Sequence, residues 1–361
     1  MTFPNPDLNV LPVRSPADLL ALLPYLIGYV PVDSLVAVGL EQGQIIFAGR
    51  IDLPTDPADS DEGAGRYQAA ARESAATLAA TVVPQNPTSV VLVGYGTREQ
   101  VTPMLEVAAA VYTAAGVPVG LALRVTDGRF FHDHCTNCPP EGTAFDPTSS
   151  PAAAHAVYAG RVALPNRAAY AARLAPIDGP ERDAMTQATT RAARRLAQLL
   201  DRTTANPATL HEVGEAAIRD ALHRYQQSGR LLDDDAAFLT VLLRHIPVRD
   251  QPWSITDASA HHIALGSDLT RRARPDLVPA PASLLAFAAW RAGEGTLATL
   301  ALNRALQARP RLPDGPAAAP DGPGRPTALR PGRLERITTR RHYTSARPQR
   351  DRLSTNRTRT P

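Results

Sequence analysis

Lysine is absent from this 361-residue chain, and all 38 of its basic side chains are arginines. This absence excludes the phosphate-binding loop G-x-x-x-x-G-K-[ST], which needs a lysine to reach the phosphates. An arginine-only, alanine-rich composition is typical of GC-rich coding DNA, so it indicates a genomic bias before it indicates a binding site. Only two cysteines are present, which is too few for a disulfide framework and favours a reducing compartment.

Long apolar runs are also absent. The most apolar window, "ALLPYLIGYVPVDSLVAVGL", is interrupted by Pro24, Pro31 and Asp33, so it does not predict a membrane span. The first residues, "MTFPNPDLNV", lack the charged and apolar regions of a signal peptide. We therefore expect a cytoplasmic protein with no membrane partner.

The hydrophobic pattern of the first 148 residues predicts an α/β domain. A helix capped at Ser15 runs to about Ile27 and is followed by a hairpin, two helices that alternate with a buried strand, and a second hairpin turning at Asp127-Gly128. After the first helix the predicted order is β-β-α-β-α-β-β, which is a mixed sheet with flanking helices.

The strand "IIFAGRIDL" is predicted to have one buried and one polar face, because side chains alternate along a strand. The buried face would contain Ile45, Phe47, Ile51 and Leu53, and the polar face Arg50 and Asp52. The acidic stretch "TDPADSDEGAG" that follows predicts a flexible loop.

Composition divides the chain into four parts. We predict an α/β domain over 1–148, a connecting segment over 149–178, an all-helical domain over 179–309 and a disordered Arg/Pro-rich tail over 310–361. The tail contains 12 arginines and 4 acidic residues, a net charge of +8, which leaves 26 basic and 31 acidic residues, a net charge of −5, for the rest. The basic character of the chain therefore resides in its tail.

Four separated stretches resemble one known family. These are "LPVRSPADLLALLPYLIGYVPVDSLVAVGL", "FAGRIDLP", "CPPEGTAFD" and "PASLLAFAAWRAGEGTLATLALNRAL", and in this order they resemble the actinobacterial family of domain of unknown function 4192. The family has no assigned activity, so the resemblance transfers no functional residue. The chain departs from the family in having fewer cysteines before "PPEG" and in its ending after Pro310.

The stretch "FFHDHCTNC" is a candidate zinc site. Its candidate ligands are His132, His134, Cys135 and Cys138. C-x-x-C supplies two ligands from one turn, but a continued strand would put the histidines and Cys135 on opposite faces. A shared ion therefore needs a sharp turn between His134 and Cys138, or outside ligands such as His261 and His262. The alternatives are two reduced, part-buried thiols at a strand end, or a redox dithiol.

A second candidate site follows the buried strand "VVLVGYG". Gly94 and Gly96 precede Thr97, which starts a helix, and such a turn can bind an anion through backbone N–H groups. The same residues also fit a tight turn and an ordinary helix cap. Three polar side chains of the first hairpin are further candidates for ligand contact: Asp33, Ser34 and Asp52.

These patterns leave several functions open, and they do not decide whether the protein is an enzyme. Our first hypothesis is a cytoplasmic protein that binds a small anionic ligand near Gly94–Thr97 and a protein partner through its helical domain. The first alternative is a metal-dependent enzyme that uses the His132–Cys138 segment, with Asp33 or Asp52 nearby. The second is nucleic-acid association through the basic tail, by release of counterions.

Overall fold

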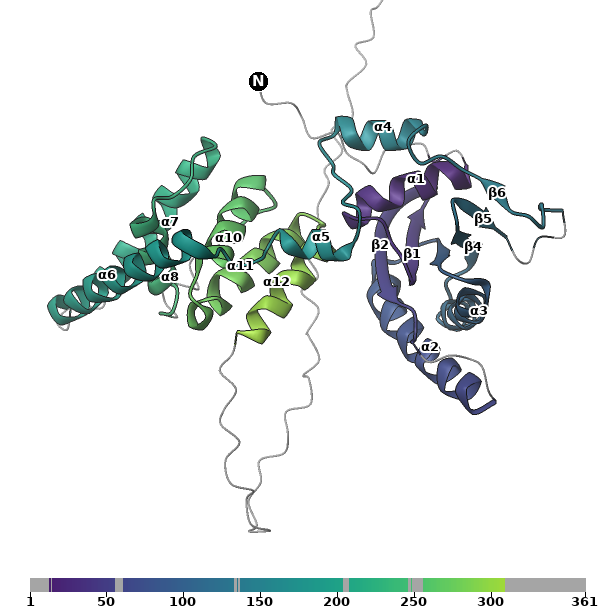
Figure 1. Ribbon diagram of the computed structural model, residues 1–361, viewed down its shortest axis with the longest axis horizontal. Helices are drawn as coiled ribbons and strands as arrows, with labels where there is room; N and C mark the ends of the chain where they lie inside the picture. Colours follow the sequence, from purple (N-terminus) through teal and green to yellow (C-terminus); the bar gives the residue numbers. More distant parts are fainter. Residues whose placement is uncertain are drawn as a thin grey trace, which may run out of the picture. The chain divides into compact units, whose positions relative to one another are not determined.

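A six-stranded mixed sheet organises the first half of the chain in the computed structural model, with the strand order β2-β1-β3-β4-β5-β6 (Figure 1). The structure describes these residues: 13, 15–55, 61–132, 135, 137–203, 208–245, 248 and 256–308. The predicted α/β class is confirmed, and the structure adds one short strand, β6, to the predicted order.

Helix α1 (Pro16–Ile27) begins and ends as the sequence predicts. The side chain of Ser15 accepts a hydrogen bond from the backbone N–H of Asp18, and proline occupies the first turn, where its missing N–H costs nothing. The helix ends at Gly28, whose φ of 95° lies in the left-handed region that glycine adopts without strain.

Strands β1 (Ser34–Glu41) and β2 (Gln44–Asp52) form the predicted hairpin, but a β-bulge changes its faces. Leu40 pairs with Ile45 and Gly39 pairs with Phe47, so Ile46 has no partner in the ladder. The extra residue reverses the alternation. Ile45 therefore packs with the cluster under α1, whereas Phe47 and Ile51 pack with the opposite cluster, and the prediction of one shared face was wrong for Ile45.

The remaining elements of the sheet follow the predicted alternation. Helix α2 (Asp61–Val82) begins within the stretch predicted as a loop, since acidic residues suit a first helical turn. The chain continues through a 3-10 turn (Val83–Gln85) and then these elements: β3 (Ser89–Tyr95), α3 (Arg98–Ala114), β4 (Val119–Thr126), β5 (Arg129–Phe131) and β6 (Thr143–Ala144). Only β3 and β4 pair in parallel among the ladders that the structure describes.

Helices cover the sheet on its two faces (Figure 1). Helices α2 and α3 pack on one face, over Leu35, Ala37 and Leu92. Helix α1 packs on the other, over Val36, Val38 and Val93. Because both faces of β1 and β3 are buried, these strands are continuously apolar, as the sequence indicated.

The connecting segment 149–178 contains two short helices. Helix α4 (Pro151–Tyr158) packs on α1, and the side chain of Ser150 both caps α4 and donates a hydrogen bond to Asp18 of α1 at 2.9 Å. In helix α5 (Arg167–Ala172), Tyr170 contacts Gly28 so closely that a Cβ there would lie 2.3 Å from the ring. This segment therefore belongs to the folded unit.

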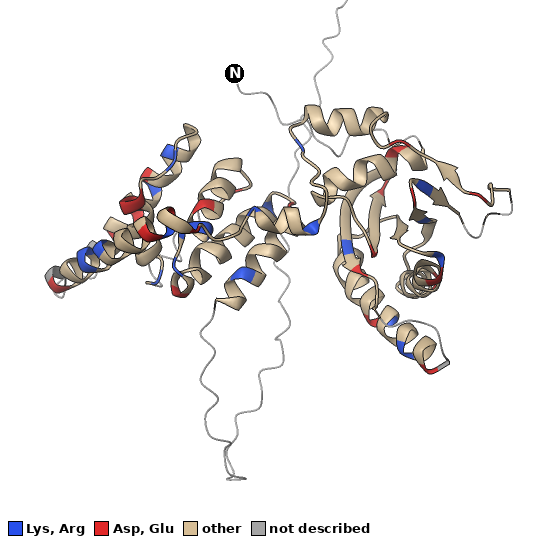
Figure 2. Cartoon of the chain, in the orientation of Figure 1, with Lys and Arg blue, Asp and Glu red and all other residues tan. Residues whose placement is uncertain are grey.

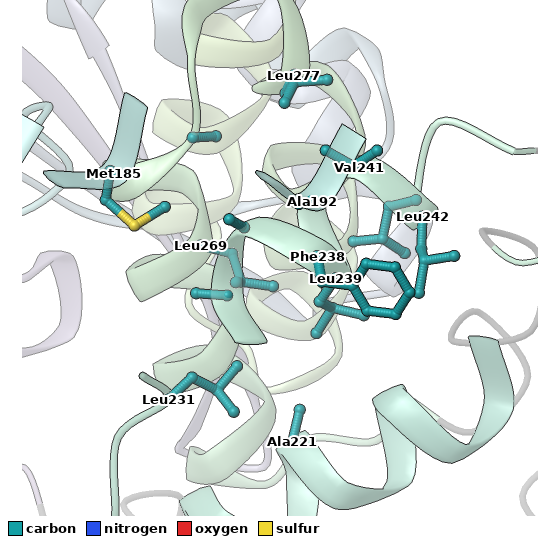
Figure 3. Packing of buried hydrophobic residues seen from close by; sticks show 14 of the residues in the cluster. Met185, Ala192, Ala221, Leu231, Phe238, Leu239, Val241, Leu242, Leu269 and Leu277 are labelled. Carbon is teal, nitrogen blue, oxygen red and sulfur yellow. The ribbon is translucent and has the colours of Figure 1, made fainter. Parts of the chain in front are cut away.

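The part of the chain between 179 and 308 that the structure describes is helical, as predicted. Its elements are α6 (Gly179–Thr203), α7 (Ala208–Gln226), α8 (Asp233–Leu242), α10 (Ala260–Arg272), a 3-10 turn (Pro275–Leu277), α11 (Pro279–Arg291) and α12 (Gly295–Gln307). Figure 3 shows Phe238, Leu239 and Leu242 of α8 within the hydrophobic cluster that these helices share. Figure 2 shows both signs of charge on α6 and α7.

One charged network is buried among these helices. Arg272 is 2% exposed, and it donates hydrogen bonds to Asp268 at 2.8 Å, to Asp233 and to the backbone oxygen of Leu231 at 3.0 Å. Tyr225 donates to the same Asp268 at 2.7 Å. The guanidinium of Arg272 thus links the start of α8 to the end of α10. Its charge is tolerated in the interior because it is paired with carboxylates.

Contacts divide the chain into two units, Met1–Pro310 and Arg311–Pro361. The boundary between an α/β domain over 1–148 and a helical domain over 179–309 remains a prediction. The tail predicted to be disordered, 310–361, lies outside the described residues. None of the helices in the described part of the chain combines the length and the apolar character needed to cross a bilayer.

Candidate functional site

A cavity of about 580 Å³ opens beside the sheet, where the first residues of β1 meet the last residues of β3 and β4. This volume lies in the range of small-molecule sites. Helix α1, the segment after it, the turn between β4 and β5 and the segment after β6 form the wall. The residues of the wall are Leu20, Ala21, Pro24, Tyr25, Val30, Pro31, Val32, Asp33, Tyr95, Gly96, Val125, Thr126, Asp127, Gly128, Phe145, Pro147, Thr148 and Ala163.

The topology explains the position of this pocket. Strands β3 and β4 are parallel and joined by α3, so their carboxyl ends lie at the same edge of the sheet. The chain leaves that edge at Gly96 after β3 and at Asp127 after β4. In open α/β sheets, ligands bind in the space outside the carboxyl ends of the strands.

Two buried hydroxyl groups lie at this edge. Ser34 and Tyr95 pair across β1 and β3, and strand alternation places both on the face covered by α1. Ser34 is 0% exposed and Tyr95 is 8% exposed, and neither hydroxyl has a hydrogen-bond partner among the residues that the structure describes. Burial raises the pKa of Tyr95, so its phenol stays neutral and can donate a hydrogen bond.

The structure brings part of the predicted ligand set to this pocket. Asp33 and Gly96 are in its wall, and Ser34 adjoins the wall through its pairing with Tyr95. Asp52 pairs with Ser34 across the hairpin, outside the wall. Its carboxylate lies 2.5 Å from the guanidinium of Arg50 and 2.9 Å from that of Arg167, so it joins α5 to the sheet.

Gly94 and Thr97 lie outside the pocket wall. A Cβ at Gly94 would lie 2.2 Å from a methyl group of Val101, so this glycine permits α3 to pack against β3. Thr97 precedes α3 without a side-chain bond to the helix backbone, and its hydroxyl lies 3.3 Å from the amide oxygen of Gln100. Gly94 is thus closed off by α3, and Gly96 is in the pocket wall, but its backbone N–H already donates to the oxygen of Val125 at 3.1 Å.

The candidate metal ligands separate into two clusters. His132, Cys135 and Cys138 place one nitrogen and two sulfur atoms within 4.8 Å of one another, and the two sulfurs are joined as a disulfide. The structure therefore differs from the interpretation of this stretch as two reduced, part-buried thiols. His134 lies outside the described residues.

His261 and His262 do not join the cysteines but form a second cluster with Asp257. Nδ1 of His262 lies 2.7 Å from Oδ1 of Asp257 and 3.0 Å from the hydroxyl of Ser259. Burial lowers the pKa of His262, which favours its neutral ring. Burial alone would raise the pKa of Asp257, but hydrogen bonds from Ser259 and His262 lower it to about 2.

Sequence reasoning missed Tyr95 and Asp127 as pocket residues. Tyr95 is the only side chain with a polar tip between Ser89 and Gly96, which was the one available signal. Asp127 was identified only as a turn residue, because the pattern does not show what faces a turn. Both become recognisable once the parallel pairing of β3 with β4 is known.

Comparison with known proteins identifies a family. A family described as "Domain of unknown function (DUF4192)" matches residues 16–313, from the first residue of α1 to beyond α12. The matched region includes the whole pocket wall and both clusters of candidate metal ligands. No curated protein and no solved structure matches the chain.

Proposed function

The chain belongs to the DUF4192 family, and we propose that it binds a small organic molecule in the pocket beside Tyr95. The description of the family assigns no activity, so the proposal is based on the side chains of this chain. The ligand has an apolar body, a polar atom that reaches the Tyr95 hydroxyl, and a positive charge at the rim. This is a binding function, and it invokes no catalytic group.

The buried hydroxyl of Tyr95 carries the proposal. A phenol that is removed from water without a partner costs roughly 1–3 kcal/mol, and a ligand atom that reached this hydroxyl, after a small movement of the pocket wall, would recover that cost. The hydroxyl of Ser34 directly across the ladder has no partner among the described residues either, so two such groups gather at one edge of the sheet.

The charge of the wall favours a cation over the anion that we expected from the sequence. Asp33 and Asp127 are the acidic residues of the wall, both are exposed, and no arginine or histidine of the described chain belongs to it. The rest of the wall is mainly apolar, with threonine hydroxyls at Thr126 and Thr148. Negative charge at the rim raises the local concentration of a cationic ligand.

A pair of probes tests the sign of the charge. Tryptamine and indole-3-acetate share an aromatic body and differ in charge, and we expect ligand-detected NMR to show binding of the amine alone. Titration calorimetry on the Tyr95→Phe variant, which loses one oxygen atom, should show roughly 5- to 10-fold weaker binding, as expected for one lost hydrogen bond.

A filled pocket provides the second test. The Ala163→Trp variant places a large side chain in the wall, whereas Val162→Trp changes the neighbouring residue, which is 66% exposed and outside the wall. Only the first substitution should abolish binding. The proposal would be contradicted if both probes bound equally well, or if no member of a wider set of arylalkylamines bound. It would also be contradicted if Tyr95→Phe or Ala163→Trp bound tryptamine with the affinity of the wild type.

A protein partner for the helical region is supported by a different observation. Trp290, Leu302 and Leu306 are 68%, 49% and 60% exposed, and the two leucines are one helical turn apart on α12. Apolar side chains on one helix face are a common basis of protein contacts. This second function does not depend on the pocket.

A further inference from the structure

The loop between β5 and β6 gathers three chemically related ligand groups. The imidazole of His132 and the sulfurs of Cys135 and Cys138 lie within 4.8 Å of one another, and all three residues are half-buried. Two backbone bonds fold the loop: the N–H of Cys135 donates to the oxygen of His132 at 2.9 Å, and that of Cys138 donates to the oxygen of Cys135 at 3.4 Å. This is the sharp turn that a shared ion requires.

The three groups match the preference of zinc. With bonds of about 2.3 Å to sulfur and about 2.0 Å to nitrogen, a tetrahedral zinc ion holds these ligand atoms about 3.5–3.8 Å apart. The three ligand atoms of the cluster lie within 4.8 Å of one another, so reduction of the two sulfurs and side-chain rotation are the changes that zinc binding requires. Two cysteines and one histidine leave the fourth position of the ion open to water or another ligand.

The same two sulfurs are joined as a disulfide in the structure, and a disulfide sulfur is not the thiolate that zinc needs. We propose that the loop is a redox-controlled zinc site: reduced, it binds one zinc ion through His132, Cys135 and Cys138, and oxidised, it releases the ion. This property is independent of the pocket beside Tyr95.

The switching step balances with a small disulfide as the oxidant. One thiolate attacks the disulfide RSSR, which breaks its S–S bond and expels RS⁻, and the second thiolate then displaces the other RS⁻. The products are the Cys135–Cys138 disulfide, two RS⁻ and one Zn²⁺. Two electrons pass from the cysteines to RSSR, and no proton is needed because both thiols are already deprotonated by the metal.

The cluster of Asp257, His261 and His262 is the competing site. It lies at the N-terminus of α10, where the partial positive charge of the helix opposes a cation. In addition, this cluster offers zinc one carboxylate and two imidazoles but no thiolate. The thiolate loop is therefore the stronger zinc site.

The first experiment measures metal binding by the reduced full-length protein. After reduction with a phosphine and removal of the reductant, we expect one zinc per chain by elemental mass spectrometry, and a sulfur-to-metal absorption band with Co²⁺. The Cys135→Ser/Cys138→Ser variant should lose both signals. His132→Ala should bind zinc at least about 10-fold more weakly, since even outer-shell changes cost about 10- to 100-fold.

The His261→Ala variant is the matched control, because it removes a histidine from the competing cluster only. It should retain one zinc and the Co²⁺ band. Loss of zinc in this variant, or retention of zinc in the double cysteine variant, would place the ion at the wrong cluster and overturn the proposal. Absence of zinc and of the Co²⁺ band from the reduced protein would overturn it as well.

The second experiment tests the switch on the zinc-loaded protein. Oxidised glutathione should release one zinc per chain to a chromogenic chelator, together with two equivalents of glutathione. Zinc retained after the disulfide has formed would show that the cysteines are not its ligands. Circular dichroism before and after oxidation separates release from unfolding, because a loop at the sheet edge can change without loss of helix signal.

Discussion

At the residue scale, the two ring nitrogens of His262 lie in different surroundings. Its side chain is 9% exposed, with Asp257 and Ser259 at Nδ1. Its Nε2 has no partner among the described residues, and the ring borders an apolar cavity of about 40 Å³. The hydrogen bond to Asp257 favours a charged ring, but burial outweighs it and lowers the pKa of His262.

This lowered pKa predicts a loss of stability in mild acid. The unfolded histidine titrates near pH 6.5, so below about that value the unfolded state binds more protons than the folded state. The free energy of unfolding should therefore decrease from about pH 7.5 to about pH 5.5, as shown by urea unfolding midpoints. His262→Gln should make that decrease smaller.

The matched control for this prediction is His155→Gln, which removes a histidine from α4 instead. Its unfolding midpoints should show the wild-type decrease between the two pH values. An identical decrease in His262→Gln and in the wild type would mean that other groups are responsible for the acid sensitivity.

At the element scale, the junction between α1 and α5 depends on a missing side chain. Gly28 ends α1 with a φ of 95°, and Tyr170 of α5 occupies the space where a Cβ would be, 2.3 Å from its ring carbon. The backbone also links the segments, because Leu164 donates to the oxygen of Gly28 and Val30 donates to the oxygen of Leu164. Conformation and packing therefore both demand glycine here.

We predict that Gly28→Ala lowers the free energy of unfolding by about 2–4 kcal/mol. The control is Gly43→Ala in the β1–β2 turn, which has a φ of 79° and open space around it, so it should lose only about 1 kcal/mol. Adding Tyr170→Ala to Gly28→Ala should relieve the clash and give a combined loss smaller than the sum. If chemical denaturation shows that the losses of the two single variants simply add in the double variant, the clash between the new methyl group at position 28 and Tyr170 is not the cause.

The sequence predicted the elements whose signals are local. Ser15 and Gly28 mark the ends of α1, and the Asp127-Gly128 turn, with φ values of 49° and 71°, joins β4 to β5 as expected. The bulge at Ile46 escaped prediction because it depends on how β2 pairs with β1, and no pattern within β2 marks it. Non-local pairing also decides which side chains share a face.

The candidate site was predicted only in part for the same reason. Asp33 and Gly96 were recognised because a polar residue and a glycine at a strand end are visible in one short stretch. The pairing of Tyr95 with Ser34 joins residues about 60 positions apart, and it creates the polar edge of the pocket. The contact between Val101 and Gly94 likewise depends on how α3 packs against β3.

At the scale of the whole molecule, charge is distributed unequally between the two units. Residues 310–361 have a net charge of +8 and the remainder a net charge of −5. An acidic body repels nucleic acid, whereas a basic segment binds it through counterion release. We therefore propose that any association of this protein with nucleic acid depends on the C-terminal segment.

We predict that the full chain binds duplex DNA weakly and without sequence preference, and that a chain ending at Pro310 does not bind it. Fluorescence anisotropy should show a loss of affinity of about 10³-fold or more between about 50 and about 200 mM salt. The shortened chain should unfold at the same temperature as the full chain, since it retains the whole of the first unit, Met1–Pro310. Salt-independent binding, or binding by the shortened chain, would contradict this prediction.

The bulge at Ile46 also bears on whether copies of this protein aggregate. Strand β2 is at one edge of the sheet, and a long, regular edge strand is a template on which another chain can add. The extra residue bends that edge and interrupts its row of free backbone groups, and Arg50 and Asp52 place charges near its end. The β-bulge that sets the two faces of this hairpin thus also opposes aggregation through the edge strand. A chain lacking Ile46 should precipitate at lower concentrations than the wild type.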